Sequence, residues 1–475
     1  MLSLDPRAAK QSPSKCLPIV GDLVQVRSRR WLVEEVIRPE KLHQSPLVRL
    51  ACADDAQGQS LDVFWEYELD RRILEEEGWQ DLAAKGFDAP RQFAAFLHAL
   101  RWNCVTATDP NLFQAPFRAG IKIDAYQMEP LRKALRLPRV NLFIADDTGL
   151  GKTIEAGLIA RELLLRKKAK TIVVVAPPSV LEQWKAELEE RFGLVFFDTL
   201  RAPRKQNEKV ANWRREAPIR PVVFEDTGVL TEDTVHLHLE QRVAQRLLAR
   251  FRSQGFIHHD LSRACLAQVA DSIPRVVLLS RLSLYGQGAE RLHEELVPLA
   301  ARWIEPSQRK GPLTPYAREA EAKTLDLLEH SLGSNGRRPP DEAIQRKLLT
   351  ATPRDIEELL PQLEPRAEEL ALLAIDKLRK RGEREEKDLR ETLERQRQWV
   401  REELAKNERD FTQLTFDFGD EEKRQLESDM RSWRGRLDQF ERDLQREPHR
   451  VREFYEVRAK RIEPVGLVYL WPESN

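Results

Sequence analysis

The stretch ADDTGLGKTIEAGL, residues 145–158, joins an apolar run to an amphipathic run through a glycine-rich loop. The run VNLFIA, residues 140–145, predicts a buried strand, and IEAGLIARELLL, residues 154–165, predicts a helix. Backbone N–H groups that converge at the start of a helix bind anions, and the helix dipole favours negative charge there. The stretch therefore predicts a phosphate-binding loop in an α/β sheet.

The residue types in this loop suit a nucleotide. Gly149 and Gly151 allow the backbone to curl around phosphates, Lys152 can reach the β and γ oxygens, and the Thr153 hydroxyl can hold Mg²⁺. The strict pattern of such loops has glycine at the position of Asp146. Because a strand precedes the loop and a helix follows it, we predict nucleotide binding; a chance glycine turn is the alternative.

A second strand–loop–helix unit follows the first. TIVVVAPP, residues 171–178, predicts a strand, and SVLEQWKAELEERF, residues 179–192, predicts a helix. Two such units in series are the start of a parallel α/β sheet. Earlier in the chain, alternating apolar and polar residues between 21 and 69 predict short strands of a small antiparallel barrel, and 70–140 has helical periodicity.

The second half of the chain is different in character. Residues 201–235 are polar and poorly periodic, which predicts a junction. In 236–305 we expect helices at 239–251 and 290–303 around a strand pair at 275–286. The terminal run 462–472 is expected to form a strand that pairs with 274–284. The expected fold class is multidomain α/β plus α, divided as 1–70, 71–200, 201–235, 236–305 and 306–475.

Residues 306–475 are almost wholly helical and highly charged. One stripe has the spacing of a heptad seam, and it consists of Leu426, Met430, Trp433, Leu437, Phe440 and Leu444. A looser stripe precedes it, formed by Leu389, Leu393, Val400, Leu404, Phe411 and Leu414. The segment TFDFGDEE can turn the chain between them, so we predict an antiparallel coiled-coil hairpin; a single solvated helix is the alternative.

Bulk composition excludes several classes of protein. Lys plus Arg (78) equal Asp plus Glu (78), so any nucleic-acid contact needs a local cluster of charge. The four cysteines form no CxxC pair, which argues against a structural zinc site and fits a reducing compartment. The sequence has no apolar leader at its start and no 18-residue apolar run. We therefore expect a cytoplasmic protein without a membrane segment.

These motifs resemble a known family in combination. DDTGLGKTIEAGL, with YQMEPLRKAL before it and VVVAPPSVLEQWKAEL after it, resembles the first motifs of Swi/Snf-type superfamily 2 helicase-like ATPases. The RapA/HepA-like branch is most similar, including the DrmD-like helicases of DISARM phage-defence systems. The resemblance implies an SH3-like barrel, a partial RecA-like lobe, ATP and Mg²⁺ as cofactors, and a nucleotide site of Gln127, Thr148, Gly149, Leu150, Gly151, Lys152 and Thr153, with Gln127 reading adenine.

The resemblance also implies partners. Complete members of the family move on duplex DNA, and residues 177–184, with Ser179, would lie near the DNA backbone. RNA polymerase or other defence subunits are the protein partners that it implies. A separate basic cluster at Arg27, Arg29 and Arg30, beside Trp31, is a second candidate for contact with DNA; an ordinary solvated strand edge is the alternative. Further basic clusters lie at 166–170 and 201–209.

The hydrolytic motifs of the family are not found. Hydrolysis needs an acidic pair at a strand end and an arginine that neutralises the γ-phosphate. Asp341-Glu342 is followed too closely by TATPR, residues 350–354, to lie on an adjacent strand, and we expect Thr350 or Thr352 to cap a helix that starts near Arg354. The weak catalytic candidates are Glu225 and Asp226, which follow a short apolar run.

Two functional hypotheses follow. The first is a Swi/Snf-type protein that binds ATP·Mg²⁺ but has lost its central motor region, so that hydrolysis is in doubt. The second is a non-enzymatic scaffold with a vestigial loop. A partner subunit could also supply the second lobe. The histidines at 236, 238, 258 and 259 predict no metal site, because no cysteine pair accompanies them.

Overall fold

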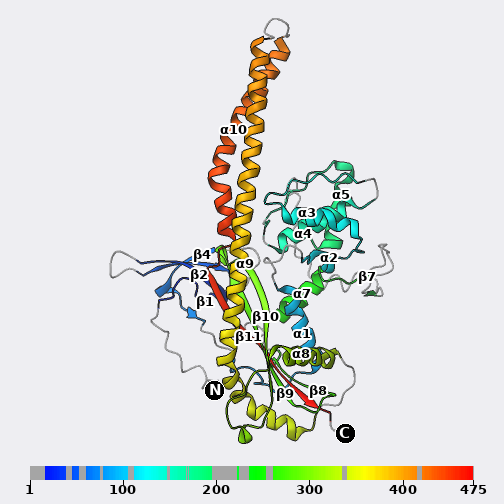
Figure 1. Ribbon diagram of the computed structural model, residues 1–475, viewed down its shortest axis with the longest axis vertical. Helices are drawn as coiled ribbons and strands as arrows, with labels where there is room; N and C mark the ends of the chain where they lie inside the picture. Colours follow the sequence, from blue (N-terminus) through cyan, green and yellow to red (C-terminus); the bar gives the residue numbers. More distant parts are fainter. Residues whose placement is uncertain are drawn as a thin grey trace, which may run out of the picture.

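The computed structural model describes most of the chain in separate ranges: 17–38, 45–52, 60–74, 79–104, 112–146, 150–166, 168–169, 171–194, 222–223, 235–252, 260–333, 340–413 and 420–473. Figure 1 shows an N-terminal sheet, a body of short helices, a central sheet and a long helical hairpin. In the ranges described, no helix is both long and apolar enough to cross a bilayer.

The N-terminal sheet is antiparallel throughout. Its strands are β1 (Leu23–Val26), β2 (Arg29–Ile37), β3 (Leu47–Cys52), β4 (Ser60–Phe64) and β5 (Arg72–Ile73), in the order β4-β3-β2-β1-β5. Alternate residues such as Val24, Trp31 and Leu50 are buried in one small core. The predicted short antiparallel strands between 21 and 69 are confirmed.

The central sheet brings together residues far apart in the sequence. Its strands are β8 (Ala264–Val269), β9 (Arg275–Tyr285), β10 (Arg291–Arg302) and β11 (Ala459–Pro472), in the order β10-β9-β11-β8. β11 is antiparallel to β9 and parallel to β8. The predicted pairing of the terminal run with 274–284 is confirmed, so residues on both sides of the long hairpin share one sheet. The predicted strand pair at 275–286 is instead the single strand β9.

The predicted helix at 290–303 is wrong, because these residues form β10. The segment is rich in helix-forming Glu, Leu and Ala, but Pro298 interrupts it and the long partner β9 supplies a ladder along its whole length. Leu299 faces one core and Ala300 the other, as the alternation of a strand requires. Tertiary pairing therefore overrides local propensity here.

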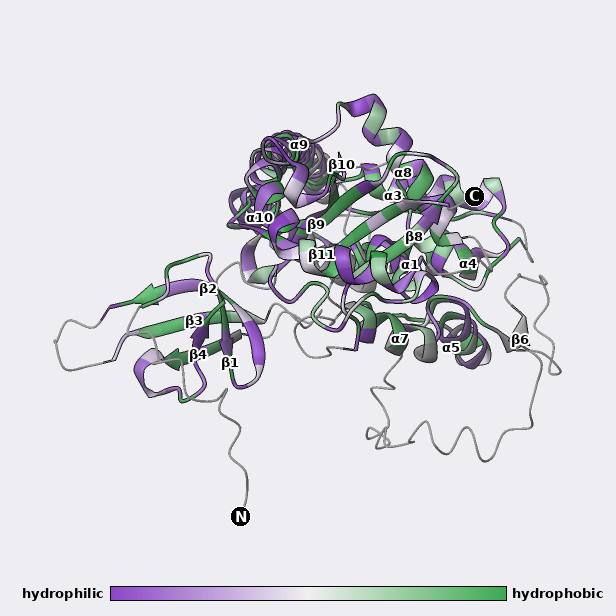
Figure 2. Cartoon of the chain, turned by 90° about the horizontal axis from the view of Figure 1, so that it is seen from below, coloured by the Kyte–Doolittle hydropathy of each residue, from purple (hydrophilic) through white to green (hydrophobic). Residues whose placement is uncertain are grey.

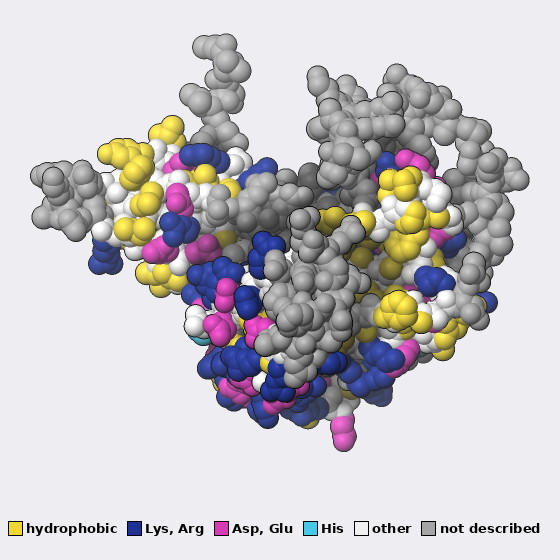
Figure 3. Space-filling model, turned by 90° about the horizontal axis from the view of Figure 1, so that it is seen from above, with side chains coloured by type: hydrophobic (Ala, Val, Ile, Leu, Met, Phe, Trp, Pro, Cys, Tyr) yellow, Lys and Arg dark blue, Asp and Glu magenta, His cyan; other side chains and the backbone are white. Residues whose placement is uncertain are grey.

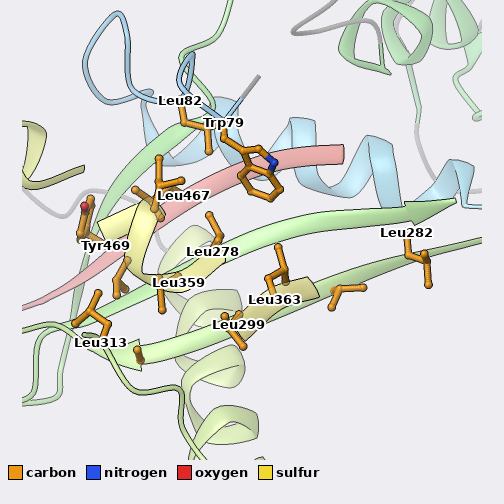
Figure 4. Packing of buried hydrophobic residues seen from close by; sticks show 14 of the residues in the cluster. Trp79, Leu82, Leu278, Leu282, Leu299, Leu313, Leu359, Leu363, Leu467 and Tyr469 are labelled. Carbon is orange, nitrogen blue, oxygen red and sulfur yellow. The ribbon is translucent and has the colours of Figure 1, made fainter. Parts of the chain in front are cut away.

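Helices cover both faces of the central sheet. On one face, the first part of α9 (Glu342–Gln413) contributes Leu359 and Leu363 to a core with Leu278 and Tyr469 (Figure 4). On the other face lie α1 (Pro90–Asn103), α7 (Arg242–Arg252) and α8 (Arg318–Gly333). Figure 2 shows hydrophobic colour along these strands and mainly hydrophilic colour on the hairpin helices. The sheet is therefore buried on both faces.

The long hairpin consists of α9 and α10 (Asp420–Phe454), which run side by side away from the sheet (Figure 1). Their contact buries members of the two predicted stripes, among them Leu393, Val400 and Phe440. The side chains of Phe411, Leu414 and Leu426 lie outside the described residues, as does the turn at 414–419. The predicted antiparallel packing of the two stripes is therefore found where they are described.

The predicted helix cap near Arg354 is wrong. α9 already begins at Glu342 and continues through this segment without interruption. Thr350 and Thr352 lie inside the helix, where their hydroxyls donate to the carbonyl oxygens of Arg346 and Leu348 at 2.9 and 3.0 Å. These threonines satisfy their hydroxyls within the helix and cap nothing.

The loop quoted first lies in a separate helical body. This body contains α2 (Ala115–Arg118), the 3₁₀ turn η3 (Ala125–Gln127), α3 (Met128–Arg136), α4 (Lys152–Leu165) and α5 (Pro178–Phe192). Leu131, Leu158 and Phe192 are among its buried core residues. The predicted helices 154–165 and 179–192 correspond to α4 and α5 and are confirmed.

The predicted strands at 140–145 and 171–178 are not formed. Residues 141–146 and 171–177 are described but pair with no other strand. Phe143 is 92% exposed and Val175 is 93% exposed. The short strands β6 (Val222–Val223) and β7 (Val235–His236) pair only with each other within the described ranges. A strand needs at least one hydrogen-bonded neighbour, and the described residues supply none here.

Candidate nucleotide site

Gly151 forms the tip of α4 in a conformation that requires glycine. It is the N-cap residue, with φ +90°, and its carbonyl oxygen accepts hydrogen bonds from Ile154 N at 2.8 Å and Glu155 N at 3.1 Å. A Cβ atom at this position would lie 2.6 Å from Gln127 Nε2. The backbone therefore turns tightly into the helix at a position that only glycine suits.

Lys152 lies directly after this turn and folds back over the preceding segment. Its Nζ atom donates to the carbonyl oxygen of Asp146 at 2.6 Å. Thr153 occupies the first turn of α4. The predicted site residues Thr148 and Gly149 lie outside the described residues. The structure thus brings the lysine and threonine to the same helix tip as Gly151, as the sequence predicts.

The 3₁₀ turn η3 holds the loop from the other side. Gln127 Nε2 donates to the carbonyl oxygen of Leu150 at 3.2 Å, and the Tyr126 hydroxyl donates to the same oxygen at 3.0 Å. Gln127 is 6% exposed, and its Oε1 atom is buried without a hydrogen-bond partner within the described ranges. A buried acceptor without a partner is costly, so this atom suits an incoming donor.

Glu155 is a site residue that sequence reasoning missed. It is 1% exposed and lies one turn into α4. Burial, together with the hydrogen bond and the negative charge of Asp146, raises the pKa of Glu155 to about 7, although Lys152 acts in the opposite direction. Glu155 therefore holds its proton more strongly than an ordinary glutamate, beside the lysine. The only signal in the sequence was an acidic residue in the first turn of a helix.

Buried ion pairs fix α4 against its neighbours. Glu162 is fully buried and accepts hydrogen bonds from Gln114 N at 2.9 Å, Ala115 N at 2.7 Å and Arg166 Nε at 2.7 Å. Arg161 contacts Glu240, a residue beyond the predicted junction. These contacts hold the helix that presents the loop, so the position of Lys152 is set by the rest of the body.

The predicted DNA-binding residues lie on different elements. Arg27 pairs with Glu68 at 2.5 Å, and Arg30 pairs with Glu463 at 3.3 Å, so both charges are compensated by carboxylates. Arg29 is exposed, and Ser179 is exposed in the first turn of α5. Figure 1 shows the N-terminal sheet and the α4–α5 body as separate parts, so these residues do not form one patch.

Trp31, which the sequence places beside the arginines, is 5% exposed. Its Nε1 atom donates to the carbonyl oxygen of Val26 at 2.9 Å. Its ring is buried in the core of the N-terminal sheet, so a nucleic-acid base cannot stack on it. Trp184 is partly buried against the core of the helical body.

The catalytic candidates Glu225 and Asp226 lie outside the described residues, as do the basic cluster 201–209 and the histidines at 258 and 259. Asp341 and Glu342 lie at the start of α9, far along the chain from the loop and on the helix that covers the central sheet. His238 Nε2 contacts the carbonyl oxygen of Glu190 at 2.7 Å. Across the described ranges, no group of three or more potential ligands could hold a metal ion.

Parts of this chain are similar to known proteins. Residues 25–222 match the family described as SNF2-related domain. RNA polymerase-associated protein RapA of Pasteurella multocida (strain Pm70) is 29% identical over 197 residues, which are 38% of this chain and 20% of that protein. RapA of Pseudomonas aeruginosa (strain LESB58) is 28% identical over 233 residues, covering 45% of this chain and 22% of that protein.

A third relative matches a shorter segment. The uncharacterized ATP-dependent helicase YqhH of Bacillus subtilis (strain 168) is 42% identical over 67 residues, or 14% of this chain and 12% of that protein. Residues 25–222 of this chain are therefore similar to the SNF2-related domain, and parts of the chain are similar to the RapA proteins. The chain spans about a fifth of the length of the two RapA relatives.

Proposed function

We propose that this chain binds ATP with Mg²⁺ at the N-terminus of α4, as a helicase-like protein of the Swi/Snf type. The observation that carries the proposal is the left-handed Gly151 at a helix tip, with Lys152 directly after it and Gln127 against the same loop. This arrangement offers backbone N–H groups and one cation to a triphosphate. The relatives, by their printed names, include an ATP-dependent helicase.

Each described residue has a distinct task in this proposal. Lys152 would exchange the carbonyl oxygen of Asp146 for phosphate oxygens. The Thr153 hydroxyl would be a ligand of Mg²⁺. The Oε1 atom of Gln127, buried without a partner within the described ranges, would accept a hydrogen bond from the adenine amino group. By sequence position, Thr148 and Gly149 would complete the phosphate contacts.

We propose further that hydrolysis is slow or absent. The described carboxyl groups beside the loop are Asp146 and Glu155, and burial raises the pKa of Glu155 to about 7. A carboxyl that keeps its proton is a poor ligand for Mg²⁺. In this proposal the chain has lost the central motor region, which would carry the missing acid pair and arginine. Without those groups the bound ATP is hydrolysed slowly or not at all.

A scaffold is the second candidate function. The central sheet and the hairpin form a large packed unit that does not include the loop. In this proposal the N-terminal sheet is a small SH3-like barrel, the hairpin is a coiled coil, and both bind partners. RNA polymerase is one such partner, because the relatives are named as RNA polymerase-associated proteins. Duplex DNA and the subunits of a DISARM-type defence system are the others that the resemblance suggests.

Ligand-induced stabilisation tests the proposed function. Saturating ATP with Mg²⁺ should raise the unfolding temperature of the intact chain, because a ligand at 100 times its Kd adds about 2.7 kcal/mol. Lys152→Ala should remove the shift. Lys122→Ala, which removes a lysine whose side chain is 73% exposed, should keep it. Equal shifts for both variants would mean that the loop is not the site.

Phosphate release separates the enzyme from the scaffold. We expect no steady-state release above the buffer rate, with or without duplex DNA. DNA-stimulated release that Lys152→Ala abolishes would show that this chain hydrolyses ATP, and would contradict the proposed loss of turnover.

A further inference from the structure

The tyrosine that precedes Gln127 holds the loop through its hydroxyl group. Tyr126 Oη donates to the carbonyl oxygen of Leu150 at 3.0 Å, and Gln127 Nε2 donates to the same oxygen at 3.2 Å. Gln127 Nε2 also donates to Tyr126 Oη at 3.2 Å. Two polar atoms of η3 and one of the loop thus form a closed triangle, in which the Leu150 oxygen accepts two hydrogen bonds from the same side.

These two hydrogen bonds set the orientation of the peptide unit between Leu150 and Gly151. The unit is planar and trans, so its N–H group points away from its carbonyl oxygen. Because the oxygen is held against η3, the N–H of Gly151 faces the opposite side of the loop. A Cβ atom on Gly151 would lie 2.6 Å from Gln127 Nε2, so the loop packs closely against the turn that holds it.

Side-chain charge alone does not make the tip of α4 attractive to an anion. Lys152 lies beside the carboxyl groups of Asp146 and Glu155. On the face seen in Figure 3, apolar side chains gather on the body that carries α3, α4 and α5, while charged side chains surround the hairpin. A phosphate at this tip would therefore depend on backbone N–H groups, and a carbonyl oxygen turned toward it would repel it.

We propose that Tyr126 is a positioning residue, whose hydroxyl group turns the Leu150–Gly151 peptide unit so that its N–H is directed at the phosphates of the bound nucleotide. This inference rests on the proposed nucleotide site and adds a residue to it. A group that is already fixed in its binding orientation loses less entropy when the ligand arrives, so the hydroxyl increases the affinity for phosphate.

Tyr126→Phe tests the proposal, because it keeps the ring and removes the hydroxyl group. Titration calorimetry of the full chain with ATP and Mg²⁺ should give a Kd about three- to tenfold above the wild-type value, the effect of roughly one hydrogen bond. Tripolyphosphate with Mg²⁺, which carries no base, should lose affinity by the same factor. Tyr67→Phe, at a tyrosine that is 72% exposed in the turn after β4, is the matched control and should keep both wild-type Kd values.

The ligand-free variant provides a readout that separates positioning from a structural role. Tyr126 is 48% exposed and does not belong to the core of the helical body, so the unfolding temperature of free Tyr126→Phe should equal that of the wild type. A lower unfolding temperature with unchanged Kd values would mean that the hydroxyl serves only the stability of the fold, and would overturn the proposal.

The calorimetric outcomes distinguish this inference from the proposed function. Binding of ATP that is insensitive to Tyr126→Phe would overturn the inference alone. A loss confined to ATP would also overturn it, because the hydroxyl would then act on the base, as would tripolyphosphate that does not bind the wild type. Failure of the wild-type chain to bind ATP would overturn the proposed function and this inference together.

Discussion

At the scale of single residues, the buried carboxyl group of Glu155 makes the stability of the helical body depend on pH. Glu155 is buried, and the pKa of its carboxyl is raised from 4.5 to about 7. Between these values the folded chain binds more protons than the unfolded chain. The free energy of unfolding therefore decreases as pH rises through this window.

Glu155→Gln should remove this dependence, because the amide mimics the protonated carboxyl. For the wild type, titration of Glu155 should lower the free energy of unfolding of the helical body by about 1–3 kcal/mol between pH 4.5 and 7. In the variant this contribution should be absent. Thermal unfolding at a series of pH values measures the difference. Glu129→Gln, at a side chain that is 44% exposed, should show the same decrease in the free energy of unfolding as the wild type. A Glu155→Gln variant with the same pH dependence as the wild type would rule out the raised pKa of Glu155.

The sequence predicted that Gly151, Lys152 and Thr153 lie together at the start of a helix, which the structure shows. Their contact with phosphates stays a prediction. Glu155 was not predicted, since its chemistry depends on Asp146, whose carboxyl reaches it only after the chain turns at Gly151. The role of Tyr126 was also missed, because its hydroxyl meets Leu150 through the placement of η3. Such contacts arise from tertiary packing, and no regular spacing of residues in the sequence predicts them.

At the scale of elements, α1 and the backbone before β8 pack closely against β11 at Gly466. A Cβ atom on Gly466 would lie 2.7 Å from the Phe93 ring and 2.9 Å from the carbonyl oxygen of Arg263. The register of β11 against β9 shifts between Pro464 and Gly466. The glycine thus allows α1 and the backbone before β8 to pack against the strand.

Gly466→Ala should destabilise the protein by about 1–3 kcal/mol, because backbone and a buried ring must both move. Gly435→Ala is the matched control, since a Cβ atom there meets nothing within 4 Å on α10. That variant should be stabilising by about 0.5–1 kcal/mol through helix propensity. Urea unfolding measures both changes. A neutral Gly466→Ala would contradict the close packing.

Elements with strong local patterns were predicted correctly, as α4, α5 and the hairpin stripes show. β10 was missed because its sequence favours a helix, and only the ladder with β9 makes it a strand. The opposite error occurred at 171–177, where a good strand sequence has no partner within the described ranges. In both cases a segment distant in the sequence determines whether a strand forms, and local periodicity carries no information about that segment.

At the scale of the whole molecule, one buried cluster joins the loop body to the base of the hairpin. Lys168 Nζ, just beyond α4, contacts the two Glu385 oxygens at 2.9 and 3.0 Å, and the Tyr455 hydroxyl donates to the same carboxylate at 2.9 Å. Burial raises the pKa of Glu385, but Lys168 and Arg381 outweigh it and lower the pKa below its usual value. The carboxylate is therefore ionised between cations of two bodies.

Glu385→Gln should uncouple the unfolding of the loop body from the unfolding of the hairpin. It leaves Lys168 and Arg381 buried without a counter-charge, which costs about 3–5 kcal/mol. Calorimetry should then show the loop body unfolding at a lower temperature than the hairpin. Glu391→Gln, at a side chain that is 55% exposed on the same helix, should change stability by less than about 0.5 kcal/mol. Equal effects of the two variants would mean that the cluster does not join the bodies.

The central claim is that the tip of α4 holds a nucleotide although the usual hydrolytic groups are not beside it. Isothermal titration of the full chain with ATP in the presence of Mg²⁺ tests this claim most directly. We predict saturable binding of one ATP per chain, lost in Lys152→Ala and retained in Lys122→Ala. No measurable uptake of ATP by the wild-type chain, or equal uptake by Lys152→Ala, would contradict the claim.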